Sequence, residues 1–239
     1  MSKSKKFLKR KTVCFFLILG ASVYLNNSSI FLRQEEGKPL LLAHRGLGQT
    51  FPMEGISGET NTAARIYPPE HPYLENTIPS MAAAFRAGAD IVELDVQPTT
   101  DGQFAVFHDW ILDYRTNGKG VTREHTMSKE TLKKAFIPYL ALGWTGYLPA
   151  AMKNAFFYLP QKYARLLWGW PHRFIKRIKN ANSIFVLVAG EGAWSEGFDT
   201  AEDLREIPPN YAGGIWTNRI DRIGPMAKDE SDVLTHLRY

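Results

Sequence analysis

The chain of 239 residues is 44% hydrophobic and 22% charged, which is ordinary globular composition and sufficient for one main domain with a large core. Its formal net charge is +5, but six cations precede Thr12 and the remaining residues sum to −1. Overall charge therefore gives no support for a polyanion-binding face, and no nucleic-acid-binding motif is visible. The single cysteine, Cys14, excludes a disulfide framework, a zinc cluster and a thiol nucleophile in the rest of the chain.

The basic N-terminus leads into thirteen residues without a charge, Val13–Leu25, and counting on to Leu32 reaches twenty residues. A spanning helix needs about 20 residues. No small-x-small cleavage site precedes Asn26, so we expect residues 1–33 to be an uncleaved signal anchor with one transmembrane helix, in preference to a cleaved leader. The basic flank should stay cytoplasmic, which would place the folded domain outside the cytoplasm, in the periplasm of a Gram-negative cell.

A polar linker, residues 33–38, precedes the folded domain, which we expect to span residues 39–225 and to be followed by a polar tail, residues 226–239. Residues 47–74 show no periodicity and are rich in proline and glycine, which predicts a functional lid or, alternatively, a disordered insertion. Flanking this loop, the sequence predicts a strand at Leu40–Ala43, a helix from Asn76 or Thr77 to Gly88, and strands at Ala89–Val96 and Phe104–Phe107. This order indicates a parallel α/β unit.

The second half of the chain gives a weaker pattern, and residues 136–160 allow no secondary-structure prediction. The predicted elements are a helix starting at Ser128, a helix at Pro171–Asn180, a strand at Ser183–Val188, a helix at Thr200–Ile207 and a strand at Gly213–Asn218. The helix at Pro171–Asn180 is basic and amphipathic. We interpret it as an outer helix of the fold with a solvated face, and the alternative is a helix lying on an anionic bilayer.

Two carboxylates, Glu93 and Asp95, are two residues apart in the predicted strand and should project to one face. They repel each other unless a cation or a proton lies between them, and their hard oxygen ligands suit Mg²⁺ or Ca²⁺. Taken alone, the pair is more often an exposed, solvated half of a strand. The pair lies between two predicted strands that are each followed by a histidine, and this position favours a metal site.

Two histidines, His44 and His108, each follow an apolar strand, at the end where parallel α/β folds bind ligands. An imidazole pair can act as general base and general acid at neutral pH. Arg45 adjoins the first histidine and can bind phosphate oxygens in bidentate fashion. Either histidine alone would more often be structural, but the set as a whole predicts phosphodiester chemistry.

The order and spacing of these motifs resemble the glycerophosphodiester phosphodiesterase family. The matching residues are His44-Arg45-Gly46, Glu75-Asn76-Thr77, Glu93-Leu94-Asp95-Val96, Asp101-Gly102, His108-Asp109 and Arg115–Gly120. The likeness covers roughly residues 40–132 and, more loosely, residues 183–221, where Trp216–Asp221 is similar to the family's last strand.

The resemblance implies a TIM-type (β/α) barrel that hydrolyses glycerophosphodiesters to glycerol 3-phosphate and an alcohol, in lipid metabolism, with a divalent cation. It implies that His44 and His108 are the acid and base, and that Arg45 binds the phosphate. It also implies that Glu93 and Asp95 hold Mg²⁺ or Ca²⁺, and that Glu75 lines the site without being a ligand. The expected partner is a small-molecule glycerophosphodiester, with no nucleic acid and with the membrane contacted through the N-terminal helix; protein partners are unknown.

One departure from the family pattern concerns the middle of the barrel, where members usually supply a further acidic ligand and a lysine. No strand of that form lies between Asp109 and Ser183. Eight βα units typically need about 250 residues, with about 200 as the lower limit, and residues 39–239 also contain the long loop. We therefore expect an incomplete barrel that lacks middle strands, with the junction between about Leu132 and Ile137, where a helix runs into Pro138.

Three functions follow from these observations. The leading hypothesis is a membrane-anchored phosphodiesterase. The first alternative is a truncated or inactive phosphodiesterase-like protein tethered to a membrane. The second is a phospholipase D-like hydrolase of lipid phosphodiesters.

Overall fold

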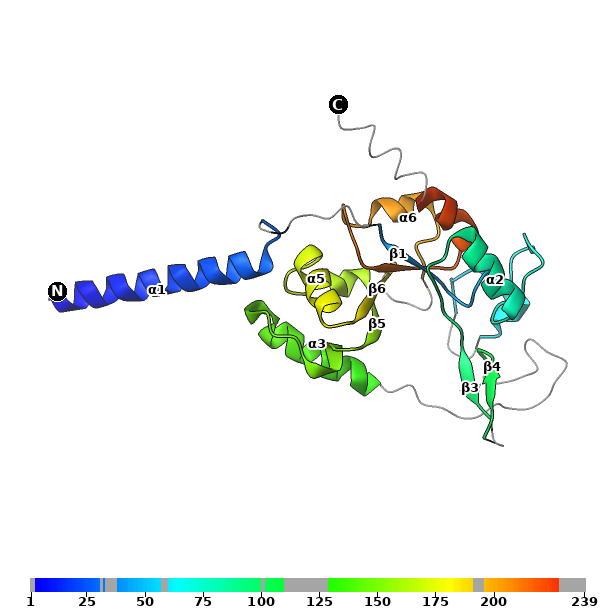
Figure 1. The fold of residues 1–239 in the computed structure, drawn as a ribbon, viewed down its shortest axis with the longest axis horizontal. Helices are drawn as coiled ribbons and strands as arrows, with labels where there is room; N and C mark the ends of the chain where they lie inside the picture. The colour runs from blue at the N-terminus through cyan, green and yellow to red at the C-terminus, as the bar shows by residue number, and fades with distance from the viewer. Residues whose placement is uncertain are drawn as a thin grey trace, which may run out of the picture.

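The structure is a computed structural model that describes residues 3–30, 32, 38–56, 60–99, 102–109, 129–190 and 196–227. Its centre is a sheet of five parallel strands in the order β2-β1-β7-β6-β5 (Figure 1). The strands are β1 (Leu40–Ala43), β2 (Ile91–Val92), β5 (Phe156–Pro160), β6 (Ile184–Val188) and β7 (Gly214–Thr217). Strands β1 and β7, the first and last strands of the chain that the structure describes, are therefore neighbours, although about 170 residues separate them.

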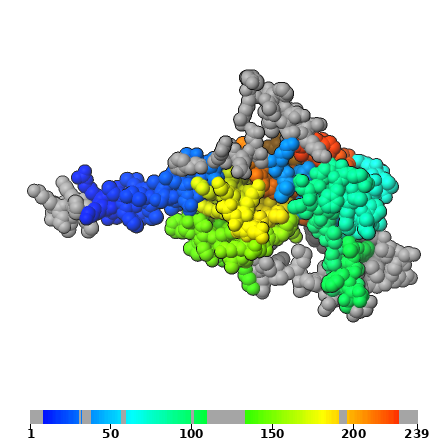
Figure 2. Space-filling view, in the orientation of Figure 1, coloured from blue at the N-terminus to red at the C-terminus, as the bar shows by residue number. Residues whose placement is uncertain are grey.

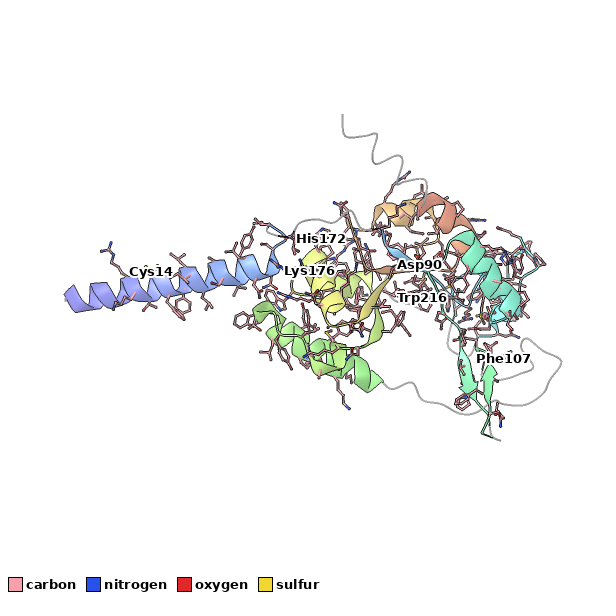
Figure 3. All side chains as sticks on the ribbon, in the orientation of Figure 1. Cys14, Asp90, Phe107, His172, Lys176 and Trp216 are labelled. Carbon is pink, nitrogen blue, oxygen red and sulfur yellow. The ribbon has the colours of Figure 1, made fainter. Side chains whose placement is uncertain are left out.

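The central strands β1, β7 and β6 are buried on both faces, so they are apolar almost throughout. Alternate residues of the strands form two separate clusters. Leu41 and Ile215 belong to the larger cluster with the helices, whereas Leu42, Val186 and Trp216 form a smaller cluster on the other face. Trp216 lies where the strands converge in Figure 3. A parallel α/β fold was predicted from the sequence, and the sheet confirms it.

Helices cover the face of the sheet that carries the larger cluster. They are α2 (Ile78–Ala87), α3 (Lys129–Leu142), α4 (Gln161–Ala164), α5 (His172–Asn180) and α6 (Ala201–Arg205), with short 3-10 helices η1 (Thr62–Arg65), η3 (Gly143–Thr145) and η4 (Ala150–Met152), and residues 220–227 are also helical. Phe174, Ile175 and Ile178 of α5 are buried in the core. This packing supports the interpretation of the basic helix as an outer helix of the fold.

The predicted ends of α2 are confirmed in detail. Thr77 caps its N-terminus by accepting a hydrogen bond from the backbone N–H of Ser80, and Pro79 lies in the first turn. Gly88 ends it with a φ of 110°, a left-handed conformation that favours glycine.

Three predicted elements differ in the structure. The strand expected at Ala89–Val96 is split into β2 and a separate strand, β3 (Val96–Pro98), which pairs antiparallel with β4 (Phe104–Val106) in a two-stranded hairpin outside the main sheet. Helix α3 runs through Pro138, because Ala135, Phe136 and Tyr139 are buried against the core and hold the helix together. The abrupt helix end expected at Pro138 is therefore wrong, whereas the junction inferred from it stays a prediction. The third difference is strand β5, which lies in residues 136–160, where the sequence allowed no prediction.

The main sheet contains five strands within the described ranges, fewer than the eight of a closed barrel. Neither β2 nor β5 has a second partner strand within those ranges. The boundaries of the expected domains, and the incompleteness of the barrel over the whole chain, stay predictions, because residues 110–128 and most of the tail lie outside the described residues.

Helix α1 (Lys3–Asn27) projects from the body as a separate arm (Figures 1 and 2). The expectation of a transmembrane helix is wrong: within the part of the chain that the structure describes, no helix combines the length and apolar character needed to cross a bilayer. The helix does not reach Leu32, as a span of twenty residues would require, because it ends at Asn27. The side chains of Asn26 and Asn27 donate hydrogen bonds to the carbonyl of Trp144 at 3.1 and 2.8 Å. The cellular location expected from that helix stays an untested prediction.

Candidate active site

The site begins at the carboxyl end of β1, where the chain turns sharply after Ala43. His44 continues the pairing with β7 by donating its backbone N–H to the carbonyl of Thr217 at 3.0 Å. Arg45 and Gly46 then have φ values of 59° and 80°. A left-handed arginine is uncommon, and such strained residues cluster at functional sites. A Cβ on Gly46 would lie 2.6 Å from the hydroxyl of Ser80, so glycine permits the close approach to α2.

The buried guanidinium of Arg45 connects three polar side chains. Its Nη1 lies 3.2 Å from Glu75 Oε1, and its Nε lies 3.1 Å from Asp95 Oδ2. The same Nε–H also points at Nε2 of His44, 3.0 Å away. One cation therefore balances two carboxylates in a partly enclosed site. Among the described residues, these contacts use Nε and Nη1, which leaves Nη2 for a ligand.

Glu93 lies beside this arrangement and accepts a hydrogen bond from the backbone N–H of Arg45 at 3.2 Å. Its Oε2 is 4.0 Å from Nε2 of His44. Burial and, after it, the charge of Asp95 raise the pKa of Glu93 to about 7, although the backbone N–H and charge of Arg45 and the charge of His108 lower it. The expected repulsion between the two carboxylates is therefore present.

Asp95 is held in place by Asn76. The prediction that Glu93 and Asp95 lie on one regular strand is wrong, because both residues lie between β2 and β3. Asn76 donates its Nδ2–H to Asp95 Oδ2 at 3.0 Å and accepts the backbone N–H of Asp95 at 2.9 Å. The sequence suggested only a helix-capping role for Asn76. Its φ of 58° places it just before α2 with its side chain turned toward the acid pair.

His44 is buried between the acid pair and the last strand. Its Nδ1 lies 2.7 Å from Oδ1 of Asn218, and its ring packs against Trp216 with centroids 4.3 Å apart. Burial and the neighbouring Arg45 charge hold the pKa of His44 well below its ordinary value, while the hydrogen bond to Asn218 raises it and the charge of His108 lowers it. His44 is therefore neutral around pH 7.

His108 follows β4, an antiparallel strand outside the main sheet, so its predicted place at the end of a parallel strand is wrong. Its Nδ1 lies 2.7 Å from Oδ1 of the buried Asp109. The hairpin nevertheless brings His108 close enough for its charge to lower the pKa of both His44 and Glu93. Asp109 belongs to the His108-Asp109 motif, but the sequence predicted no separate role for it.

A cavity of about 320 Å³ adjoins this cluster. Its lining includes His44, Arg45 and Glu75 from the predicted set, together with Asn218 and residues of the loop 48–53. The long loop predicted to be functional therefore forms one wall. Glu93, Asp95 and His108 are not part of this lining. The motifs at Asp101 and Arg115–Gly120 lie outside the described residues.

The donor set suits a cation that keeps most of its waters. Glu93 and Asp95 supply carboxylate oxygens whose mutual repulsion a cation would relieve, which fits Mg²⁺ bound through one or two carboxylates and the substrate's phosphate. Glu75 forms an ion pair with Arg45, and its role as a lining residue outside the ligand set stays a prediction. Within the ranges described, no group of three or more His, Cys, Asp or Glu side chains could hold a metal ion.

A parallel α/β sheet with one imidazole and an arginine directly after its first strand, a carboxylate pair after the neighbouring strand β2 and a second imidazole close to both defines a class of proteins suited to acid–base chemistry on phosphate esters. Residues 44–163 match the Glycerophosphoryl diester phosphodiesterase family. The chain belongs to this family, which implies a TIM-type α/β fold and, for the family in general, dependence on a divalent cation.

Relatives with assigned names agree with this membership. The chain is 36% identical over 97 residues to a glycerophosphodiester phosphodiesterase of Caldanaerobacter subterraneus subsp. tengcongensis, covering 41% of this chain and 30% of that protein. It is 45% identical over 62 residues to the Bacillus subtilis (strain 168) glycerophosphodiester phosphodiesterase, covering 26% of this chain and 20% of the relative. The matches therefore span less than a third of these relatives.

Among solved structures, the glycerophosphodiester phosphodiesterase from Agrobacterium tumefaciens str. C58 aligns at 17% identity with a TM-score of 0.41, covering 80% of this chain and 99% of that chain.

Proposed function

We propose that this protein hydrolyses glycerophosphodiesters to glycerol 3-phosphate and an alcohol, with His44 and His108 as base and acid. The observation that carries the proposal is the convergence of His44, Arg45 and Glu93 within hydrogen-bond or ion-pair distance, with His108 close enough to perturb the pKa of two of them. Such a set can bind a phosphate and move protons on both sides of a scissile P–O bond.

In this mechanism, neutral His44 takes a proton from the attacking water as the water oxygen bonds to phosphorus. His108, oriented by Asp109, gives a proton to the departing alkoxide as the P–O bond to the alcohol breaks. Arg45 binds a non-bridging phosphate oxygen through Nη2. Glu93 and Asp95 would hold Mg²⁺ or Ca²⁺, which when bound supplies positive charge that offsets the charge of the phosphate.

The test is turnover by the purified full chain. Glycerophosphocholine is supplied with EDTA, with Mg²⁺ or with Ca²⁺, and release of glycerol 3-phosphate is measured. We expect turnover that chelation removes and one of the two cations restores. His44→Ala and the double variant Glu93→Gln, Asp95→Asn should each lose about 100-fold or more in kcat, by loss of acid–base catalysis and of the cation.

Two controls make the result decisive. Glu202→Gln changes an acid whose side chain is 75% exposed on α6 and should keep full activity. Intact lysophosphatidylcholine and sphingomyelin serve as competing substrates. A folded wild-type protein with no turnover of glycerophosphocholine under any of the cation conditions would overturn the proposal, and turnover of intact lipids alone would replace the substrate class.

A further inference from the structure

The last strand of the sheet ends in a residue that joins a buried carboxylate to the candidate base. Asn218 follows β7, and its side chain lies between His44 and Asp199. Its Oδ1 is 2.7 Å from Nδ1 of His44, and its Nδ2 is 2.9 Å from Oδ2 of Asp199. The three side chains form a continuous hydrogen-bonded row from the start of α6 to the turn after β1.

The direction of every hydrogen bond in this row follows from Arg45. A guanidinium can only donate, so Nε2 of His44, which lies 3.0 Å from Arg45 Nε, must be an acceptor. A neutral imidazole with a bare Nε2 carries its hydrogen on Nδ1. The partner of Nδ1 must then be the carbonyl oxygen of the Asn218 amide, and the NH₂ group must face Asp199.

Asp199 is placed to hold that amide in one orientation. Its Oδ1 accepts the backbone N–H of Asn218 at 2.7 Å and the hydroxyl of Thr217 at 3.0 Å, and its Oδ2 accepts the NH₂ group. Asp199 thus accepts hydrogen bonds from both the backbone and the side chain of Asn218. A flipped amide would set two acceptor oxygens against each other and two donors against each other.

We propose that Asn218, held by Asp199, is the positioning residue that fixes the ring orientation of His44 and, together with the Arg45 donor, its Nδ1–H tautomer, so that Nε2 is the nitrogen that accepts the proton. This inference rests on the proposed function and adds to it which nitrogen acts and which residue orients the ring. Neither Asn218 nor Asp199 touches the reacting atoms in this assignment. Both act through His44.

The first test separates catalysis from binding. Asn218→Ala in the full chain should lower kcat by about 10- to 100-fold, the usual effect of removing the group that orients a functional histidine, with KM changed less than about threefold. Unchanged kcat would overturn the proposal. Glu202→Gln is the control for a polar substitution near the same helix.

The second test does not depend on turnover. Imidazole ¹⁵N shifts of uniformly labelled full chain, assigned by comparison with His44→Gln, report which ring nitrogen carries hydrogen. We expect Nδ1 protonated and Nε2 bare in the wild-type protein, and a mixture of tautomers in Asn218→Ala. A protonated Nε2 in the wild-type protein would overturn the assignment. Failure of the proposed function would instead show as absent turnover with the expected tautomer intact.

The third test exchanges the two groups. Asn218→Asp alone sets two carboxylates against each other and should lose activity by at least as much as Asn218→Ala. Adding Asp199→Asn restores a donor opposite the new carboxylate, while the other carboxylate oxygen still accepts the Nδ1–H of His44. The double variant should recover at least tenfold of the kcat lost by the single variant, and a double variant no better than Asn218→Asp would contradict the row as described.

Discussion

Nε of Arg45 lies 3.1 Å from Oδ2 of Asp95, so the group proposed to bind phosphate is paired with a carboxylate proposed to bind a cation. In the structure the two members of the site neutralise each other. A phosphate and a divalent cation would satisfy them separately, which predicts that substrate and cation bind better together than either does alone.

The Arg45 ion pairs should also stabilise the fold, and Arg45→Ala tests this. The substitution removes this cation from the buried carboxylate of Glu75 and the half-buried carboxylate of Asp95, and breaking a buried pair typically costs about 3–5 kcal/mol. Urea unfolding in EDTA measures the loss. Arg205→Ala is the control, because its side chain is 72% exposed and its removal should change stability by less than about 0.5 kcal/mol. Equal changes in the two variants would contradict the prediction.

The raised pKa of Glu93 predicts that stability falls as pH rises. Below pH 4.5 the carboxyl is protonated in both the folded and the unfolded chain; between pH 4.5 and about 7 only the unfolded chain releases the proton. Above about pH 7 the full cost is present, up to about 3 kcal/mol. In EDTA, Glu93→Gln should therefore match the wild-type protein near pH 4 and exceed its stability at pH 8. Parallel stability curves for the two proteins would exclude this effect.

Asp109→Asn should impair the proposed acid while leaving the fold in place. The carboxylate accepts a hydrogen bond from Nδ1 of His108, and an amide can present a donor there and favour the wrong tautomer. By analogy with the serine protease triad, kcat should fall by roughly 10²- to 10⁴-fold with little change in KM. Asp90→Asn is the matched control: Asp90 accepts the backbone N–H of Leu41 at the opposite end of β1, so only stability should change.

A tight contact behind the site predicts a strong effect of Gly224→Ala. An added Cβ at this position would overlap the backbone carbonyl of Ala87, at the end of α2. Overpacking against backbone costs about 1–3 kcal/mol, and here it would also displace the helix that supports Gly46. Thermal unfolding measures the loss. Gly20→Ala, with nothing within 4 Å of the new methyl group, should be neutral or stabilising.

Local signals in the sequence were sufficient to predict the ends of an element wherever nearby residues determine them. Thr77, Pro79 and Gly88 define α2 because capping and φ preferences act within a few residues. The candidate site residues follow from the same kind of local signal, since ionisable groups directly after apolar strands are costly without a function, and their roles stay predictions. The structure brings all six into one region, with Glu75 paired to Arg45 as a lining residue.

The remaining features depend on contacts between distant segments. Asn218 meets His44 only because β7 lies beside β1, 174 residues away in sequence. The exposed positions of strand β5, Phe156 and Tyr158, are aromatic, so its sequence lacks the apolar–polar alternation that identifies a strand. Pro138 predicts a helix end, but the burial of Tyr139 and Phe136 outweighs its cost. The division of the predicted strand Ala89–Val96 also depends on a distant segment, since the backbone N–H of Asp95 donates to the side chain of Asn76 and not to a neighbouring strand.

The docked end of α1 makes the protein ready for labelling. Arg177 donates hydrogen bonds to the carbonyl of Asn26 and the side chain of Asn27, so the last turn of the arm is clamped to the body. Cys14, the sole thiol of the chain, is exposed halfway along this arm (Figure 3). A fluorophore coupled there needs no engineered cysteine, and its anisotropy would report directly whether the arm tumbles with the body or swings on its own.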